Sequence, residues 1–311
     1  MKTQTSNDAA RYFNPRIDSQ TDIVNAVDGA VSPDPVKILW VGSMLIGGTI
    51  GSALTMNTGA VIVFVVSALF TLCFGHSLGM HRRFIHRSYS CPQWLEYILV
   101  HFGTIVGIAG PLSMLKTHDI RDWAQRQTKC HDYFSHSQKW YRDLWWQMFC
   151  SVKLVHPPEI QIEKTIAEDR VYALMEKTWM LQQVPWALLF FWLGGWSWVF
   201  WGICSRVSVS IFGHWIIGFF AHNEGERSWH VVGAATQGYN ISWAALLTMG
   251  ESWHNNHHAF PGSARLGLKP NQPDPGWWVL LGLQKIGLVC DLKTAKDLPA
   301  RNDMIPFQEG N

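Results

Sequence analysis

The longest stretch without charged side chains lies near the start of the chain and runs from Ile38 to Met80. It contains 43 residues with no Asp, Glu, Lys or Arg. One membrane crossing needs roughly 20 apolar residues, so the stretch is long enough for two crossings. The turn-forming sequence Met56–Gly59 divides it. We therefore expect a helical hairpin, with one helix at about 38–55 and the next at about 59–77.

Two further uncharged runs follow in the second half of the chain. Thr178–Ser205 has 28 residues and Val207–Asn223 has 17, and Arg206 stands alone between them. They predict a second hairpin, which brings the number of crossings to four. A shorter run, Tyr97–Leu115, contains three glycines and one proline, which weaken a straight span. If His86 and His118, which flank this run, reach one metal centre, the run crosses the membrane either twice or not at all. Its 19 residues are too few for two crossings, so we expect a re-entrant or interfacial segment.

The distribution of Lys and Arg predicts the orientation in the membrane. Ten of these residues lie between Lys116 and Lys177, whereas the two hairpin tips hold only Arg206. By the positive-inside rule, both termini, the central region and the C-terminal third face the cytoplasm. We expect a polar cytoplasmic tail at 1–37, which lacks the apolar core of a signal peptide, a membrane domain at 38–300 and a C-terminal tail at 301–311. The predicted fold is all-α, with four transmembrane helices and a cytoplasmic helical cap.

Composition narrows the classes of function. With 48% hydrophobic residues, 18 tryptophans and 15% charged residues, the chain is too apolar for a disordered protein. Its net charge of +2 gives no reason to expect a nucleic-acid partner. The six cysteines form no CxxC pair, which argues against a disulfide framework or a zinc ribbon. The chemistry of this protein must therefore come from other residues.

The histidines are the informative residues, because seven of them are predicted to lie at the same membrane face. They follow the second helix, the Tyr97–Leu115 run and the fourth crossing, or belong to the C-terminal third. These seven are His81, His86, His118, His222, His254, His257 and His258. Neutral imidazoles that converge in this way suit iron, zinc or copper.

The strongest local signal is the sequence Glu251–His258. His254 and His258 are four residues apart and His257 is three residues after His254, so one face of a helix would present all three rings. A histidine-rich loop in the headgroup region is the simpler alternative. His81 and His86 are five residues apart, which is about 140° around an ideal α-helix, so their rings would diverge unless the helix ends there or each binds a different metal.

Three segments together resemble the membrane-bound fatty acid desaturases of the delta-9 acyl-CoA and acyl-lipid type. They are Gly75–Tyr89, Pro111–Asp122 and Gly250–Leu268, and the resemblance extends from about Ile38 to Lys293. It implies a four-helix membrane fold with a cytoplasmic cap and a di-iron site held by histidine boxes. It also implies oxygen-dependent insertion of a double bond into a long acyl chain carried by CoA, a carrier protein or a lipid. Electrons would come from a separate donor such as a ferredoxin or cytochrome b5.

The resemblance also implies the ligands of the metal. The first box falls on His81 and His86, the isolated ligand after the fourth helix on His222, and the third box on His254, His257 and His258. The second box departs from the family pattern HxxHH, because only His118 matches. Arg121 stands where the family has a histidine, and a permanent cation cannot bind a metal.

Asp122 is the other departure in the second box. A carboxylate four residues after His118 shares its helical face and can bind iron, but it can equally form a salt bridge with Arg121 or Arg126. Gly218 stands where the family usually has an asparagine that contacts a metal through water. His131 and His136 are candidates to replace the missing ligands. His76 is either a partner of His81 or a polar residue at the helix end.

Two other functions remain open at this stage. A hydroxylase or related oxygenase can use the same scaffold, because the fate of a substrate radical depends on placement that no motif reports. A desaturase-like protein that has lost catalysis and binds lipid is the second alternative, motivated by Arg121 and Gly218. Product analysis distinguishes the first alternative, and metal analysis distinguishes the second.

Overall fold

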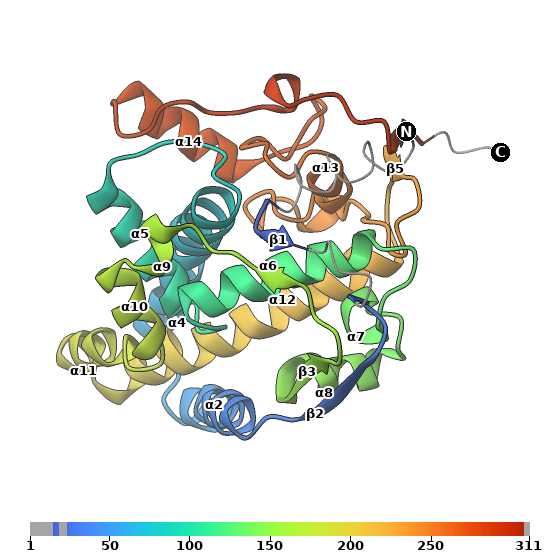
Figure 1. Ribbon diagram of the computed structural model, residues 1–311. Coiled ribbons are helices and arrows are strands. Elements are labelled where there is room, and N and C mark those ends of the chain that lie inside the picture. The colour runs from blue at the N-terminus through green and yellow to red at the C-terminus, as the bar shows by residue number, and fades with distance from the viewer. Residues whose placement is uncertain (1–14, 19–23, 308–311) are drawn as a thin grey trace.

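The computed structural model describes residues 15–18 and 24–307, and this part of the chain is mostly helical (Figure 1). The first hairpin is confirmed. Its first helix combines α2 (Pro35–Ile46), η1 (Gly47–Gly51) and α3 (Ser52–Leu54). Asp34 begins this helix by accepting hydrogen bonds from the backbone N–H groups of Val36 and Lys37 at 3.0 and 3.2 Å.

The second helix of the hairpin is longer than expected. It combines α4 (Thr58–Phe70) with η2 (Thr71–Ile85), whose backbone is π-helical. Asn57 caps its start, accepting a hydrogen bond from the backbone N–H of Ala60 at 2.9 Å. The turn therefore falls where the sequence predicted it. The helix continues beyond residue 77 and carries the Gly75–Tyr89 motif towards the cap.

The second apolar region is organised differently from the prediction. α11 (Gln183–Val199), η3 (Phe200–Ser205) and α12 (Arg206–Asn223) follow one another directly, and the break in helical geometry lies at Gly195, with φ 65° and ψ −160°. Arg206 is not at a hairpin tip. It is 1% exposed inside the helix, where its guanidinium donates to the carbonyls of Gly202 and Ile105 and to Oε1 of Gln183. Gly195, which has no Cβ atom, tolerates its positive φ and so allows the chain to turn there.

Among the described residues, three helical stretches are long and apolar enough to cross a membrane: Pro35–Leu54, Thr58–Ile85 and Gln183–Asn223. The third has 41 residues and contains the Gly195 break. The Tyr97–Leu115 run is divided between α5 (Gln93–Ile105) and α6 (Pro111–Arg126), with Gly107 at φ 89° in the connection.

α5 packs closely along η2, and two glycines of η2 make this possible. A Cβ atom on Gly75 or Gly79 would lie 2.4 Å from the backbone of Phe102 or Leu99 respectively. No side chain fits at that distance, so only glycine lets these two helices approach so closely. This contact holds the end of η2, where His81 and His86 lie.

The remaining helices are short and complete the cap. They are α7 (Asp132–Ser135), α8 (Trp140–Phe149), α9 (Lys164–Ala167), α10 (Arg170–Lys177), η4 (Ser242–Ala244), α13 (His254–Ala259), α14 (Pro275–Lys285) and η5 (Ala295–Asp297). In Figure 1, α13 and α14 lie at the opposite side of the molecule from α2.

The all-α prediction is confirmed for the bulk of the fold and needs one correction. Three antiparallel two-stranded sheets join distant segments: β1 (Ile17–Asp18) with β4 (Glu159–Ile160), β2 (Gly29–Pro33) with β3 (Cys150–Leu154), and β5 (Trp229–Val231) with β6 (Met304–Pro306). The strands are too short to show an alternating pattern. Residues 29–33 and 304–306, which the sequence assigned to polar tails, thus pair with the body of the protein.

Candidate metal centre

The structure gathers the seven histidines into two groups. Within each group, one potential ligand atom of every residue lies within 4.8 Å of those of all the others. The first group consists of His81, His86, His118 and His257, and the second of His222, His254 and His258. Four separate segments of the chain contribute to them.

The π-helical backbone of η2 explains how His81 and His86 meet. The backbone N–H of His86 donates to the carbonyl of His81, five residues earlier, at 3.1 Å. A π-turn places residues i and i+5 on nearly the same side, whereas an α-helix would separate them. The two rings are consequently 4.7 Å apart between centroids. The sequence predicted divergent rings for an ideal α-helix that continues past the pair, and the π-helical geometry at this point brings them together instead.

His118 of α6 and His257 of α13 complete the first group. Nε2 of His118 lies 3.3 Å from Nε2 of His86, and the ring centroid of His257 lies 4.5 Å from that of His81. Both ring nitrogens of His257 are buried and have no hydrogen-bond partner in the described part of the chain. Buried polar atoms are rarely left without a partner, so these two nitrogens fit a residue whose ring binds a metal ion.

The second group lies where α12 ends beside α13. Nε2 of His254 is 3.1 Å from Nε2 of His222 and 2.9 Å from Nε2 of His258. His254 and His258 share one face of α13, as their spacing predicted. Three ring nitrogens so close together repel one another when all are protonated, and a cation between them removes that repulsion.

Electrostatics keeps the cap histidines in the form that binds metals. Burial lowers the pKa of His254, His257 and His258 well below the ordinary value, and the neighbouring histidines lower it further. His118 differs, because although burial lowers its pKa, Asp122 and Asp119 raise it overall. Most of the cluster is therefore neutral, and neutral imidazole is the ligand form.

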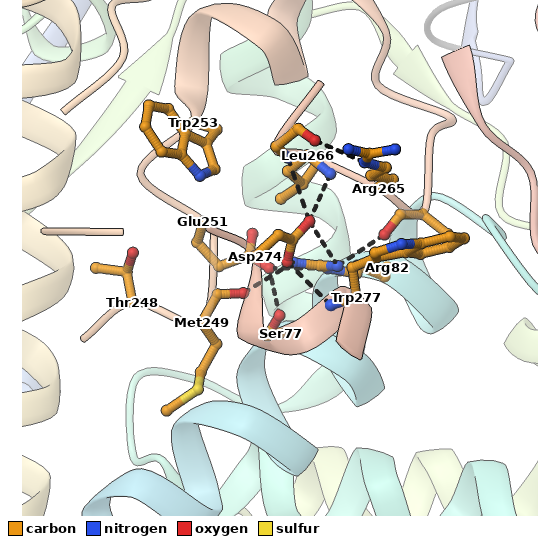
Figure 2. Close-up of polar contacts among 12 residues, drawn as sticks. Ser77, Arg82, Thr248, Met249, Glu251, Trp253, Arg265, Leu266, Asp274 and Trp277 are labelled. Carbon is orange, nitrogen blue, oxygen red and sulfur yellow. Dashed lines mark hydrogen bonds and ion pairs between the residues drawn. The ribbon is translucent and has the colours of Figure 1, made fainter. Parts of the chain in front are cut away.

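A buried network of charges lies next to His81, and Figure 2 shows the part of it formed by Ser77, Arg82, Glu251 and Asp274. Oε2 of Glu251 lies 2.5 Å from Nδ1 of His81, and Oε1 accepts hydrogen bonds from Ser77 at 2.5 Å and Arg82 at 3.2 Å. Arg82 in turn donates to Oδ1 of Asp274 at 2.8 Å. A carboxylate at Nδ1 fixes the orientation of the ring and leaves Nε2 for a metal.

Asp274 connects this network to the C-terminal segment. Its carboxylate accepts hydrogen bonds from the backbone N–H groups of Leu266 at 2.7 Å and Trp277 at 2.9 Å, and the second of these caps α14 (Figure 2). Sequence reasoning missed Glu251 and Asp274 as members of the site. The Asp-Pro pair at 274–275 was an available signal of a helix start, but nothing in the sequence linked it to Arg82.

The residues of the altered second box have separate environments. Asp122 is buried but belongs to neither histidine group, and its Oδ2 lies 4.0 Å from Nη2 of Arg126. Burial lowers the pKa of Arg126 to about 10, although Asp122 opposes this. Arg121 donates to Nε2 of His136 at 3.1 Å and to Gln147 at 2.9 Å.

His136 lies beside the second histidine group. Its ring stacks on that of His222 at 5.2 Å, and its Nδ1 lies 2.9 Å from the fully buried carboxylate of Asp143. A Cβ atom on Gly218 would be 3.4 Å from Nε2 of His136, which is an ordinary van der Waals contact, so this ring alone does not require a glycine at 218. His131 instead caps α7, accepting from the backbone of Tyr133.

The ring of His76 lies beside two other histidine rings. Its ring is parallel to that of His81 at 6.3 Å and perpendicular to that of His214 at 5.2 Å. It thus lies next to the first group rather than at the end of η2, which continues to Ile85.

Comparison with known proteins agrees with this arrangement. The family model described as fatty acid desaturase matches residues 58–270. The chain is 34% identical over 272 residues to an sn-1 stearoyl-lipid 9-desaturase of Anabaena variabilis. The matched region covers 86% of this chain and 97% of the relative. It is 30% identical over 249 residues to delta-9 acyl-lipid desaturase 1 of Arabidopsis thaliana, covering 78% and 76%. An acyl-CoA C20 delta5-desaturase of Anemone leveillei is 29% identical over 248 residues, covering 76% of each chain.

Proposed function

Because this chain belongs to the fatty acid desaturase family, we propose that it inserts a double bond into a long acyl chain in a reaction that uses molecular oxygen and bound iron. The observation that carries the proposal is the convergence of seven buried or half-buried histidines into two groups. Stearoyl-lipid, acyl-lipid and acyl-CoA relatives support a long acyl substrate. The acyl group is carried by CoA, a carrier protein or a lipid.

Two iron ions are the cofactors in this proposal. The first is held by His81, His86, His118 and His257. Asp122 lies outside both groups, one helical turn after His118, and in this proposal it is a further carboxylate ligand that exchanges its contact with Arg126 for the ion. The second is held by His222, His254 and His258. Iron in an open coordination sphere supplies the oxygen chemistry needed to remove hydrogen from unactivated carbon atoms.

The protein's own residues orient the ligands and line a cavity that suits an apolar substrate. The carboxylate of Glu251 fixes the ring of His81. A largely apolar cavity of about 390 Å³ opens between the Thr58–Ile85 helix, α5 and the Gln183–Asn223 stretch, and its lining includes Val66, Phe102 and Trp186. Such a lining can accept part of an acyl chain.

In the proposed topology the chain crosses the membrane four times, and the turn between the third and fourth crossings lies at Gly195. The metal centre and both termini face the cytoplasm, in keeping with the Lys and Arg residues between Lys116 and Lys177. A separate electron donor, such as a ferredoxin or cytochrome b5, delivers electrons from that side.

Expression of the full chain in a host with a simple fatty acid profile tests the proposal. The wild type should produce a new monounsaturated fatty acid, and His257→Ala should produce none at equal membrane expression. A hydroxylated product from the wild type would identify the oxygenase alternative. Identical profiles from both proteins, with iron bound and an electron donor supplied, would contradict the proposed activity.

A further inference from the structure

The second histidine group has fewer protein ligands than the first. Four imidazoles form the first group and three form the second. Two positions that could add a donor cannot do so here. Arg121 is a cation bound to His136 and Gln147, and Gly218 has no side chain. An ion with three imidazole ligands has room for another donor from the protein.

Gln125 places a carboxamide beside the second histidine group. It lies one helical turn after Arg121 on α6 and is 1% exposed. Its Nε2 is 2.9 Å from Nε2 of His222. The same amide group donates to the carbonyl of Phe134 at 2.7 Å. The end of the side chain is therefore in contact with the nitrogen that faces the other members of the group.

The contact shows which nitrogen of His222 is available to a metal. Nδ1 of His222 lies 2.6 Å from the carbonyl of Gly218. Because a carbonyl only accepts hydrogen bonds, Nδ1 carries the proton and Nε2 has a free lone pair. Gln125 donates to that lone pair, so a metal ion bound to Nε2 displaces the amide hydrogen from it.

The amide oxygen of Gln125 has no present role. Oε1 is buried and lacks a hydrogen-bond partner within the described residues. An unsatisfied buried oxygen costs about 1–3 kcal/mol. A half-turn about the Cγ–Cδ bond exchanges the positions of the nitrogen and the oxygen and brings Oε1 to the side of His222. The turn gives up the hydrogen bond to Phe134 and brings Oε1 towards that carbonyl oxygen, so it is favourable only when Oε1 binds a cation.

We propose that Oε1 of Gln125 is the fourth protein ligand of the metal ion bound by His222, His254 and His258. The donor set of this ion is then three nitrogens and one amide oxygen, a set that iron accepts. Gln125 thereby supplies the donor that Arg121 and Gly218 do not. The inference rests on the proposed function for the presence of a second ion, but its test does not need activity.

The test is titration of the full-length, metal-free protein in nanodiscs with Co²⁺, with bound metal per chain as the readout. The wild type should bind two ions in two phases. His254→Ala should weaken one of these phases, which is thereby identified as binding to the second group. Gln125→Leu should weaken that phase at least about tenfold and leave the other phase unchanged. Gln183→Leu is the matched control, because Gln183 is also a buried amide that donates to a carbonyl at 2.7 Å, and it should retain both phases.

Gln125→Glu keeps the proposal testable if the leucine variant does not fold. Its carboxylate retains an oxygen donor, so the second ion should bind at least as tightly as in the wild type. Unchanged binding by a folded Gln125→Leu, weaker binding of the second ion by Gln125→Glu, or a single ion in the wild type would each overturn the inference. Two normal binding phases without a new fatty acid would instead refute the proposed activity and leave the role of Gln125 intact.

Discussion

Nη1 of Arg121 lies 3.1 Å from Nε2 of His136, whose ring stacks on His222. The arginine is thus held by a histidine next to the second group, and its charge lies near the proposed second ion. We predict that Arg121→His binds the second ion at least about tenfold more tightly, because the fixed charge is lost and a neutral nitrogen donor is gained. Metal titration measures the change. Arg121→Leu, which removes only the charge, should show a smaller gain, and weaker binding by both variants would contradict the prediction.

The contact between Glu251 and His81 gives a second prediction. Glu251→Gln should weaken binding of the first ion by about 10–100-fold, because the neutral amide orients His81 less firmly. Glu96→Gln is a matched control. Glu96 is also a buried carboxylate paired with an arginine of η2, 2.6 Å from Arg83, and it accepts from Tyr172 at 2.7 Å. The control should lose thermal stability and keep its metal affinity. An equal loss of affinity in both variants would show that the effect is structural.

Because η2 packs closely on α5, adding a single methyl group at Gly79 should strongly reduce the stability of the protein. In Gly79→Ala the new Cβ atom would lie 2.4 Å from the carbonyl oxygen of Leu99. We expect a loss of about 1–3 kcal/mol in stability, with a lower melting temperature in detergent. Gly42→Ala is the control, because a Cβ there meets no atom of the described residues within 4 Å. It should leave the protein unchanged or slightly more stable, since alanine favours a helix over glycine.

The ion pair of Arg16 and Glu163 predicts a dependence of stability on pH. Burial raises the pKa of Glu163, but the hydrogen bond and charge of Arg16, whose Nε lies 2.8 Å away, lower it overall from its ordinary value of 4.5. A carboxyl with a lower pKa in the folded state stabilises the protein above its unfolded pKa. This stabilisation is lost as the pH falls through the folded pKa.

Glu163→Gln should therefore reduce the melting temperature near neutral pH and have little effect in acid. Melting curves recorded across the acid range test this expectation. Arg16→Met should remove the same pH dependence, and adding Glu163→Gln to it should cause no further loss. If the single and double variants showed the same slope with pH as the wild type, the pair would not be the source.

The sequence predicted the first hairpin well because its turn has strong local signals. Asn57 is a favourable helix cap, and the flanking runs are apolar enough to identify as spans. The prediction for the second apolar region placed the turn at the wrong residue, and the reason is physical. A lone charge between apolar runs suggested a tip at Arg206, but backbone carbonyls satisfy that charge inside the helix. The break at Gly195 depends on a positive φ angle. A glycine permits this angle but also adopts helical angles, so its presence in the sequence does not predict a break.

The candidate site was partly accessible to sequence reasoning. Spacing placed His254 and His258 on one helical face, and the structure has them there. Spacing was not sufficient for His81 and His86, because the argument used α-helical geometry and the backbone there is π-helical. Gln125 and Glu251 have no distinctive spacing to any histidine, and only the tertiary fold brings them to the rings.

The π-helical turn of η2 makes the first histidine group sensitive to changes that alter no histidine. The glycine contacts with α5 hold this part of η2, and the hydrogen bond from the backbone N–H of His86 to the carbonyl of His81 keeps the two residues on nearly the same side of it. A substitution that restored α-helical geometry here would turn the two rings apart.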